Sequence, residues 1–440
     1  MKKLLIILYC IAALNISAVI INVPSDYPAI QAGLNAADCD DTVLVASGTY
    51  FENIIWPPVN GIKLTGSGEE TCIIDGSSSG SVITFDDINN IIDSTTVISN
   101  LTITNGSSGA GGGVLSYYSA PKFTEVTVTG NSANTDGGGL FCFNYSHIVM
   151  DNVTISNNTA GSEGGGINCD FTSNIVIRNS RIINNISDYS GGGLCIEGGS
   201  HPIISYTLFA NNEAQYGGGI WSGEKGSMDM INCTIADNTA TTQGGGYFSY
   251  YPTMDAVNSI FWNNIPDQIW ENADVTFSDV QDEWIGAGNI DMDPLFEDSS
   301  AGNYHLSMNS PCIDAGNPDS PTEPDGTQAD MGAFYYDQSI DVNNNETDTT
   351  VISLNNYPNP FNPTTEIRFQ LSDISDTDTA EIQLFNIKGQ LVDSIPFHSS
   401  THSLINSVIW NAEGFSSGVY FCKVVSGGKT LDTKKMLLMK

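Results

Sequence analysis

Residues 137–163 read GGGLFCFNYSHIVMDNVTISNNTAGSE, and this unit decides the fold because it recurs along the chain. The Gly-Gly-Gly triplet occurs at intervals of 26 or 27 residues, beginning at Gly111, Gly137, Gly164, Gly191, Gly217 and Gly244. Apolar and polar residues alternate between the triplets without a helical period, which indicates short β-strands. One such unit cannot bury its own apolar face, so successive units must stack. We therefore predict a parallel β-helix with one unit per coil, and roughly nine or ten coils between residues 42 and 290.

Stacking turns equivalent residues into columns, because successive coils lie roughly 4.8 Å apart. The residue after each triplet predicts one interior apolar column: Val114, Leu140, Ile167, Leu194, Ile220 and Tyr247. A second predicted interior column is Val128, Ile155, Ile182, Phe209, Ile235 and Phe261. Three residues after each of these comes a corner Asn: Asn131, Asn158, Asn185, Asn212, Asn238 and Asn264. Asn tolerates left-handed backbone angles, and its amide can bond the next Asn in the stack. The triplet glycines are expected at another corner, where positive φ and close backbone approach occur.

The ends of the solenoid also have sequence signals. Residues 1–18 predict a secretory signal peptide, with two lysines, an apolar run over 4–14 and small residues at its end. That run is too short to span a bilayer, and no later stretch reaches about 18 apolar residues, so we expect no transmembrane segment. Residues 25–37 predict a capping helix, in which Ser25 or Asp26 is the N-cap, Pro28 lies in the first turn, and Ile30, Leu34 and Ala37 share one face.

The net charge of the chain limits the kinds of partner that it could bind. The chain has a formal net charge of −36, and residues 19–340 hold 39 Asp plus Glu against five Lys plus Arg, a net of −34. Such a surface disfavours nucleic acid and anionic lipid as partners. It favours extracellular cations, of which Ca²⁺ is the obvious one, although solubility alone also explains it.

Eight of the nine cysteines lie beyond the predicted signal peptide. Cys142 and Cys169 each come three residues after a triplet, so they are expected to stack on adjacent coils within bridging range. A disulfide and a buried ladder of free thiols both remain open.

Three motifs carry resemblances for the solenoid. The pieces YPAIQ (27–31), DTVLV (41–45) and GTY (48–50) resemble the opening of the pectin-lyase-like right-handed β-helix proteins. The triplet-and-Asn repeat is similar to that of the chlamydial polymorphic outer-membrane proteins, although only 209–212 and 261–264 keep their Phe-x-x-Asn. Residues 291–336 resemble the closing segment found after β-helices in bacterial surface proteins. We therefore expect residues 19–290 to form the β-helix with its capping helix, and 291–340 to close it.

The C-terminal part carries the most specific resemblance. The pieces NYPNPFNPTT (356–365), LFNIKGQ (384–390), SGVYF (417–421) and KKMLLMK (434–440) resemble the C-terminal sorting domain of the type IX secretion system. We expect a linker over 341–352 and a small Ig-like β-sandwich over 353–440, so the fold class is all-β: a right-handed parallel β-helix solenoid followed by this sandwich. The resemblance implies export through the secretion machinery and delivery to the cell surface, in association with the outer membrane. A stalk without a sorting role is the alternative.

An enzymatic function needs a basic residue close to carboxylates. Pectin-lyase-like enzymes use a carboxylate cluster, Ca²⁺ and a base, and here the corresponding set would be Asp151, Arg178 and Arg181. Arg178 occupies the repeat position of Asp151 one coil later, so the two are expected to meet, which fits a surface ion-pair ladder as well as a catalytic pair. The Gly-His-Gly pattern of polygalacturonase-like relatives does not occur. We therefore assign no catalytic residue, and keep a polysaccharide lyase or hydrolase as the alternative.

A binding function fits better. Phe141, Trp221 and Phe248 take outward positions after the triplets, and aromatic rings on a flat sheet stack on sugars, although adjacent loops could instead cover them. Asp314, Asp319, Glu323, Asp325 and Asp330 could ligate Ca²⁺ without the EF-hand order, so Ca²⁺ is an allowed but not required cofactor. We predict a secreted cell-surface adhesin or glycan-binding protein, whose partner is an extracellular polysaccharide or the surface of a host or neighbouring cell.

Overall fold

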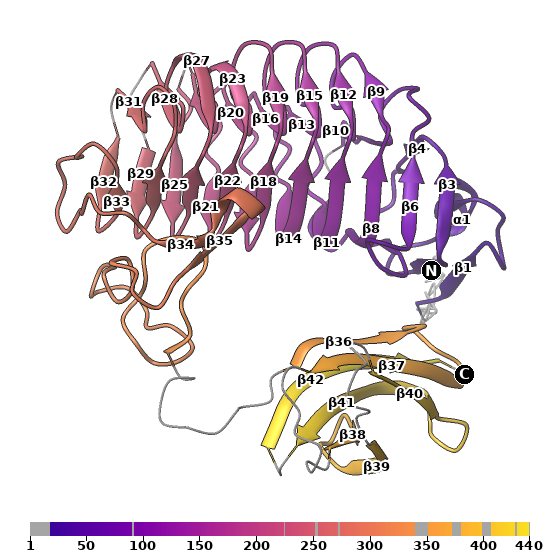
Figure 1. Ribbon diagram of the computed structural model, residues 1–440. Coiled ribbons are helices and arrows are strands. Elements are labelled where there is room, and N and C mark those ends of the chain that lie inside the picture. The colour runs from indigo at the N-terminus through magenta and orange to yellow at the C-terminus, as the bar shows by residue number, and fades with distance from the viewer. Residues whose placement is uncertain are drawn as a thin grey trace, which may run out of the picture. The chain divides into compact units, whose positions relative to one another are not determined.

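The computed structural model describes residues 18–89, 92–223, 225–250, 254–271, 273–338, 351–371, 380–397, 406–426 and 429–439. The predicted signal peptide and most of the predicted linker lie outside these ranges. The chain divides into two compact units, residues 1–338 and 339–440, which are described separately. The first unit is a right-handed parallel β-helix, as the sequence predicts, and Figure 1 shows its coils side by side along the solenoid.

Three parallel sheets build the solenoid. Sheet B has nine strands, one per coil, which confirms the predicted number of coils. Its strands are β4 (Ile54–Ile55), β7 (Ile83–Asp86), β10 (Val114–Tyr117), β13 (Leu140–Phe143), β16 (Ile167–Cys169), β20 (Leu194–Ile196), β24 (Ile220–Ser222), β28 (Tyr247–Ser249) and β31 (Ile269–Trp270). Sheet C has six short strands: β9 (Ser107–Ser108), β12 (Ser132–Ala133), β15 (Thr159–Ala160), β19 (Ile186–Ser187), β23 (Glu213–Tyr216) and β27 (Thr239–Gln243).

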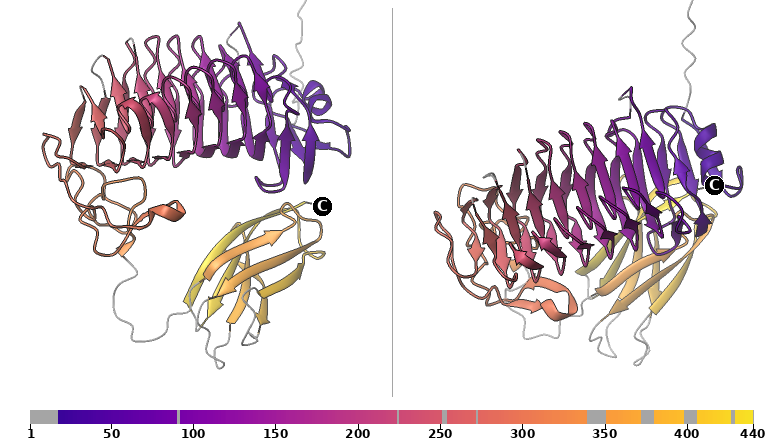
Figure 2. Two further views of the ribbon diagram at one scale, coloured as in Figure 1. Left: turned by 45° about the horizontal axis from the view of Figure 1, so that its top comes forward. Right: turned by 90° about the horizontal axis from the view of Figure 1, so that it is seen from above.

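Sheet A has 18 strands, because most coils cross it with two consecutive segments. They are β1 (Ile20–Val23), β2 (Thr42–Val45), β3 (Gly48–Phe51), β5 (Lys63–Thr65), β6 (Cys72–Asp75), β8 (Val97–Thr104), β11 (Lys122–Thr129), β14 (Val149–Ser156), β17 (Val176–Arg178), β18 (Arg181–Ile183), β21 (Ile203–Ser205), β22 (Leu208–Ala210), β25 (Met228–Ile231), β26 (Thr234–Ala236), β29 (Met254–Val257), β30 (Ile260–Trp262), β32 (Asp274–Thr276) and β33 (Asp279–Val280). Figure 2 shows the same stack from two further directions.

Both predicted interior columns are confirmed. In sheet B, Val114 pairs in register with Leu140, and the pairing continues coil by coil to Tyr247. In sheet A, Val128 begins the equivalent series that ends at Phe261. All members of both columns are buried in one continuous core. Apolar burial therefore stabilises the stack along its whole length.

The predicted Asn ladder is also present and buried. From Asn131 to Asn264, each Asn donates from Nδ2 to Oδ1 of the next at 2.9–3.0 Å, and its backbone N–H bonds the same oxygen. Gln268 Oε1 accepts the last of these bonds at 2.8 Å. The left-handed residue is the one before the ladder Asn, for example Asn157 (φ 55°) and Asn184 (φ 56°). That residue turns the chain, so that the following side chain points inward.

The glycine triplets serve the two purposes predicted for them. The first glycine of each has φ between 63° and 66°. The second and third lie under the next coil: a Cβ on Gly165 would come within 2.4 Å of the Ile186 carbonyl oxygen, and one on Gly166 within 2.6 Å of the Gly193 oxygen. Any side chain there would therefore separate neighbouring coils.

The entry to the solenoid is capped by helix α1 (Ile30–Ala36). Ile30 and Leu34 are fully buried and Ala37 nearly so, as predicted. The predicted N-cap is wrong: Ala29 precedes the helix, and the Glu52 carboxylate accepts from Ile30 N–H at 2.8 Å and Gln31 N–H at 2.9 Å. A side chain from the next coil thus replaces a local cap, and this fixes the helix to the solenoid.

The segment after the last coil folds back on sheet A. It contains β34 (Phe296–Asp298), the 3₁₀ helix η1 (Ser299–Ala301) and β35 (Asn303–Leu306). Tyr304 packs against Leu208, Ala210 and Ala236. Leu306, Cys312 and Met331 pack against Ile260. The segment therefore covers part of the outward side of sheet A.

The eight cysteines beyond residue 18 are all free thiols. Cys142 and Cys169 pair in register on adjacent coils, as expected, and both are buried. Of the two alternatives, the structure therefore has the ladder of free thiols and not the disulfide.

The second unit is a small antiparallel β domain. One sheet is β36 (Val351–Tyr357), β37 (Thr364–Leu371) and β40 (Asn406–Asn411), and the other is β39 (Leu391–Phe397), β38 (Ala380–Asn386), β41 (Gly418–Ser426) and β42 (Lys429–Leu438). Ile367, Trp410 and Met436 lie in its shared core. The last strand, β42, pairs with β41 at the edge of its sheet.

Replacing one ladder residue tests this scaffold. Asn185→Ala removes the acceptor of two buried Asn158 donors, and it removes the Nδ2 donor to Asn212 Oδ1, which keeps only the bond from the backbone N–H of residue 185. Buried unsatisfied groups cost about 1–3 kcal/mol each, so we expect a loss of about 2–5 kcal/mol in urea denaturation followed by circular dichroism. The control is Thr159→Ala at an exposed position. Equal losses in the two variants would contradict the role of the ladder.

Candidate functional site

The outward face of sheet B is the first candidate site. Side chains alternate along each strand, so the residues next to the interior column point away from the core. From β13 to β28 the outward residues pair in the order Phe141, Asn168, Cys195, Trp221 and Phe248. Two more columns flank this one: the residue before each triplet, and the residue six places after the triplet begins. We call these three columns, together with the adjoining residues Phe171 and Tyr189, the sheet B face.

Aromatic rings occupy both ends of the sheet B face. At one end Phe143 lies 5.4 Å from Phe141 and 4.8 Å from Phe171, measured between ring centroids. At the other end Phe248 lies 5.4 Å from Tyr216 and 4.9 Å from Tyr250. The face thus carries two aromatic clusters, one on the coils of β13 and β16 and the other around the coils of β24 and β28.

The sequence-predicted ligand-binding residues Phe141, Trp221 and Phe248 lie beneath these clusters. Their side chains are only 7%, 6% and 1% exposed. The exposed rings are their neighbours: Phe171 is 53% exposed, Tyr189 46% and Tyr250 55%. Contact with a ligand would therefore pass through the neighbours, while the three predicted residues support them from below.

The centre of the sheet B face is acidic. Asp136 and Glu163 precede their triplets and pair in register, while Asp170 and Glu197 come six residues after the start of theirs. Burial, and then the hydrogen bond and charge of Glu163, raise the pKa of Glu197 to about 8. Burial also raises the pKa values of Asp136, Glu163 and Asp170. Glu163 and Glu197 therefore lie close to each other in a poorly solvated position.

Sequence reasoning missed Glu163 and Glu197, although a signal was available. The triplet fixes every position in its coil, so each residue before a triplet has the same relation to the core. The column before the triplets contains Asp136, Glu163 and Ser190, and the column six places after the start of each triplet contains Asp170 and Glu197.

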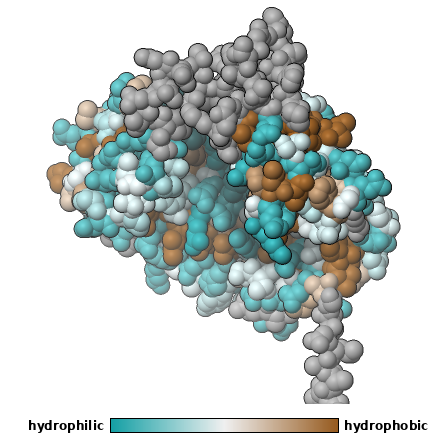
Figure 3. Space-filling model, turned by 90° about the horizontal axis from the view of Figure 1, so that it is seen from below, coloured by the Kyte–Doolittle hydropathy of each residue, from teal (hydrophilic) through white to brown (hydrophobic). Residues whose placement is uncertain are grey.

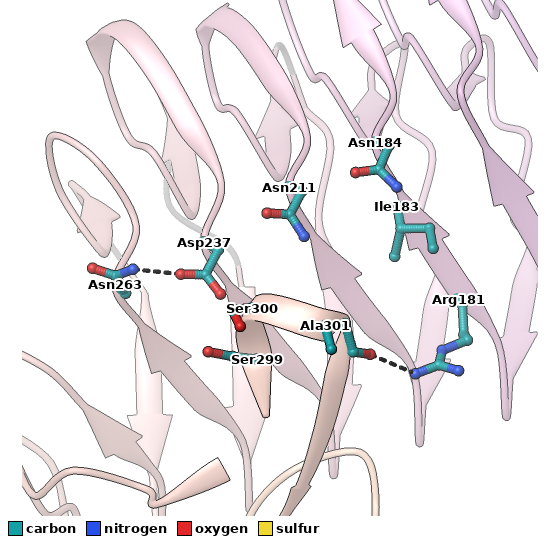
Figure 4. Close-up of a pocket in the computed structure, with 10 residues that line it drawn as sticks. Arg181, Ile183, Asn184, Asn211, Asp237, Asn263, Ser299, Ser300 and Ala301 are labelled. Carbon is teal, nitrogen blue, oxygen red and sulfur yellow. Dashed lines mark hydrogen bonds between the residues drawn. The ribbon is translucent and has the colours of Figure 1, made fainter. Parts of the chain in front are cut away.

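The second candidate site is a hollow where the closing segment meets sheet A (Figure 4). It has a volume of about 730 Å³ and is lined by Arg181, Ile183, Asn184, Asn211, Asp237, Asn263, Ser299, Ser300, Ala301 and Gly302. Arg181 and Asp237 lie toward opposite ends of it, as Figure 4 shows. Arg181 Nη2 donates to the Gly302 carbonyl oxygen at 3.2 Å, and its guanidinium lies 5.3 Å from the Phe334 ring. The Tyr304 hydroxyl donates to Asp237 at 2.7 Å, and Asn263 bonds the same carboxylate.

The other residues of the predicted enzymatic set lie elsewhere. Asp151 pairs in register with Arg178, as the repeat predicts. Asp151 accepts a 2.9 Å bond from Asn179, and the two ion pairs recorded for the described residues include neither Asp151 nor Arg178. Arg181 belongs to the next segment, β18, and faces the hollow. Asp151 and Arg178 thus lie in register on adjacent coils, whereas Arg181 lines the hollow together with Asp237.

The acidic residues proposed for Ca²⁺ organise the closing segment. Buried Asp330 accepts from the backbone N–H groups of Asp314 at 2.7 Å and Tyr336 at 2.6 Å. Asp325 accepts from Thr327 and Gln338, while Asp319 is exposed. Within the described ranges, the three-residue group whose ligand atoms converge is Glu163, Cys195 and Glu197, on the sheet B face. Metal binding by Asp314, Asp319, Asp325 and Asp330 stays a prediction.

Comparisons with known proteins agree with both units. Residues 165–289 match the right-handed β-helix region, residues 152–170 match the Chlamydia polymorphic membrane protein repeat, and residues 355–439 match the secretion system C-terminal sorting domain. The pectin methylesterase PemA from Erwinia chrysanthemi aligns over 59% of this chain and 92% of its own, with 10% identity and a TM-score of 0.34. A pectin methylesterase solved with hexasaccharide VII aligns over 62% and 90%, with 13% identity and a TM-score of 0.31. No curated protein matches the chain.

These findings define the class of protein. It is a right-handed β-helix protein with a type IX C-terminal sorting domain, and that domain indicates secretion to the cell surface. Within the described residues no helix has the length and apolar character needed to cross a membrane. On the face shown in Figure 3, hydrophilic residues cover much of the surface and hydrophobic residues lie in separate patches.

Removing the sorting domain should block delivery. Deletion of residues 353–440 is expected to leave the remaining protein in the periplasm of a host with type IX secretion, because the matched sorting sequence is lost. Cell fractionation and surface immunolabelling measure the outcome. As a control, residues 341–440 fused to an unrelated periplasmic protein should bring that protein to the surface. Normal surface delivery of the truncated chain would contradict the assignment.

Proposed function

We propose that this protein is an adhesin or glycan-binding protein that holds a neutral extracellular polysaccharide on the sheet B face. The observation that carries the proposal is the order of side chains there: exposed rings at both ends and acids between them. Sugar rings stack their apolar faces on aromatic side chains. Their hydroxyl groups can donate to the carboxyl oxygens of the acidic centre.

The spacing of the exposed rings suits an extended chain. Phe171 and Tyr250 are separated by three coils, which corresponds to roughly 14 Å along the solenoid. A polysaccharide lying parallel to the axis could therefore reach both aromatic clusters at once. The net charge of −36 and the acids of the centre repel polyanions, and this favours a neutral glycan.

Ring removal tests the proposal. The purified full chain is titrated against neutral polysaccharides such as glucans, mannans and xylans, and against pectate and alginate, by affinity electrophoresis. We expect retention by at least one neutral polymer, and Phe171→Ala together with Tyr250→Ala should weaken it about tenfold or more, since each aromatic contact contributes about 0.5–1.5 kcal/mol. The matched control is Tyr206→Ala, which removes a tyrosine that is 45% exposed between β21 and β22 of sheet A. No retention by any polymer, or equal retention by the double variant, would overturn the proposal.

The alternative is a polysaccharide lyase or hydrolase. The arrangement nearest to a lyase site is the hollow that Arg181 and Asp237 line, but the Asp237 carboxylate already accepts from Tyr304 and Asn263. For a hydrolase, a carboxylate oxygen of Glu163 and one of Glu197 lie within 4.8 Å of each other, which is closer than the roughly 5–5.5 Å separation of a retaining pair. Both observations favour binding over catalysis.

We therefore expect no unsaturated product from pectate or alginate, with or without Ca²⁺. β-Elimination needs a base beside an acidic sugar, and the negative charge of this chain opposes the approach of such a substrate. Ultraviolet absorbance of the unsaturated product is the measurement. Absorbance that appears with the wild-type chain and disappears in Arg178→Ala or Arg181→Ala would establish the alternative.

A further inference from the structure

The centre of the sheet B face gathers potential ligand atoms of more than one kind. One ligand atom each from Glu163, Cys195 and Glu197 lie within 4.8 Å of one another. Cys195 Sγ is 4.0 Å from Glu163 Oε2. Cys195 is fully buried between the two partly buried acids. Adjacent coils therefore bring a thiol and two carboxyl groups to one point.

Two buried oxygen atoms beside this group have no hydrogen-bond partner. They are Asn168 Oδ1 and Ser190 Oγ, in side chains that are 1% and 0% exposed. Asn168 pairs in register with Cys195. Ser190 pairs in register with Glu163. An unpaired buried oxygen costs about 1–3 kcal/mol, and both residues lie in register with members of the cluster, which favours a bound group there.

Electrostatics point to a cation as that group. The ion pairs recorded for the described residues join His201 to Asp229 and Arg368 to Glu366, so neither reaches this cluster. Asp136, which pairs in register with Glu163, adds a further negative charge beside the cluster. Like charges at partly buried positions destabilise the fold unless a proton or a metal ion neutralises them.

We propose that Glu163, Cys195 and Glu197 bind a divalent transition-metal ion of the Zn²⁺ class on the sheet B face. Zn²⁺ accepts one thiolate together with carboxylate oxygens, and open zinc sites have three protein ligands. Ca²⁺ takes six to eight oxygen ligands and no sulfur, so the buried thiol at the centre fits it poorly. Asn168 Oδ1, Ser190 Oγ or a water molecule is available for a further ligand position.

Metal titration of the full chain under reducing conditions tests this site, after chelator treatment. Calorimetry with Zn²⁺ should give one saturable site, and Co²⁺ should give the near-ultraviolet charge-transfer band of a cobalt thiolate. Loss of a ligand should weaken binding at least about 100-fold in Cys195→Ser and in the double variant Glu163→Gln with Glu197→Gln. Cys195→Ser should also lose the cobalt thiolate band.

Matched controls remove a thiol or an acid elsewhere. Cys39→Ser removes the exposed thiol, and Glu213→Gln removes an exposed acid at the start of β23. Both should bind as the wild-type chain does. Circular dichroism of each variant in chelator establishes that it is folded, and an unfolded Cys195→Ser chain is replaced by Cys195→Ala.

Three results would overturn the proposal: no saturable Zn²⁺ binding, an unchanged cobalt band in Cys195→Ser, or tight Ca²⁺ binding in preference to Zn²⁺. Glycan retention is a separate assay, so a chain that binds Zn²⁺ but retains no polysaccharide would support this site and contradict only the proposed function.

Discussion

The buried asparagine ladder is the constraint on which the rest of this structure depends. A primary amide in an apolar interior is costly unless its donors and acceptor are all used. Here each amide is satisfied by the coils on either side: Asn185 donates to Asn212 and to the Ile155 carbonyl oxygen, while it accepts from Asn158. A coil that shifted its register by one residue would lose these bonds. The ladder therefore holds every coil at one register, and Gln268 closes it at the end.

A fixed register separates the interior from the surface. The two interior columns that begin at Val114 and Val128 hold hydrophobic residues in every coil, because a charged replacement would be buried. The outward columns are free to vary, and on sheet B they change from Phe141 to Asn168 and Cys195, and then to Trp221 and Phe248. Different outward residues on two coils are thus enough to place an acidic centre between aromatic ends, and the scaffold stays the same. Sheet A offers less of this freedom, because residues of the closing segment pack on part of its outward side.

The repeat made most of the solenoid predictable from the sequence. Equal spacing places Val114 above Leu140 whatever the loops do, so columns, core and ladder follow directly from the triplets. Local details were less predictable, because they depend on neighbouring coils. The cap of α1 comes from Glu52, 22 residues beyond Ile30, and no local motif signals it. The hollow beside Arg181 depends on Gly302, which is 121 residues away and outside the repeat.

The candidate site was predictable in position but not in chemistry. The outward direction of Phe141, Trp221 and Phe248 follows from strand alternation. Their burial does not, because it results from rings such as Tyr216 and Tyr250 that reach across from flanking columns. Likewise, Glu163 and Glu197 are 34 positions apart, and only the direction of their side chains across adjacent coils brings them together.

Burial sets the chemistry of the acidic centre of the sheet B face. It is the largest cause of the raised pKa values of Glu163 and Glu197. The same poor solvation strengthens every electrostatic interaction at the centre, whether with a cation or with a sugar hydroxyl. Exposed acids elsewhere on this highly charged chain lack that environment. The binding proposed for this face therefore depends on the order of its residues along the stack as well as on the total charge of the chain.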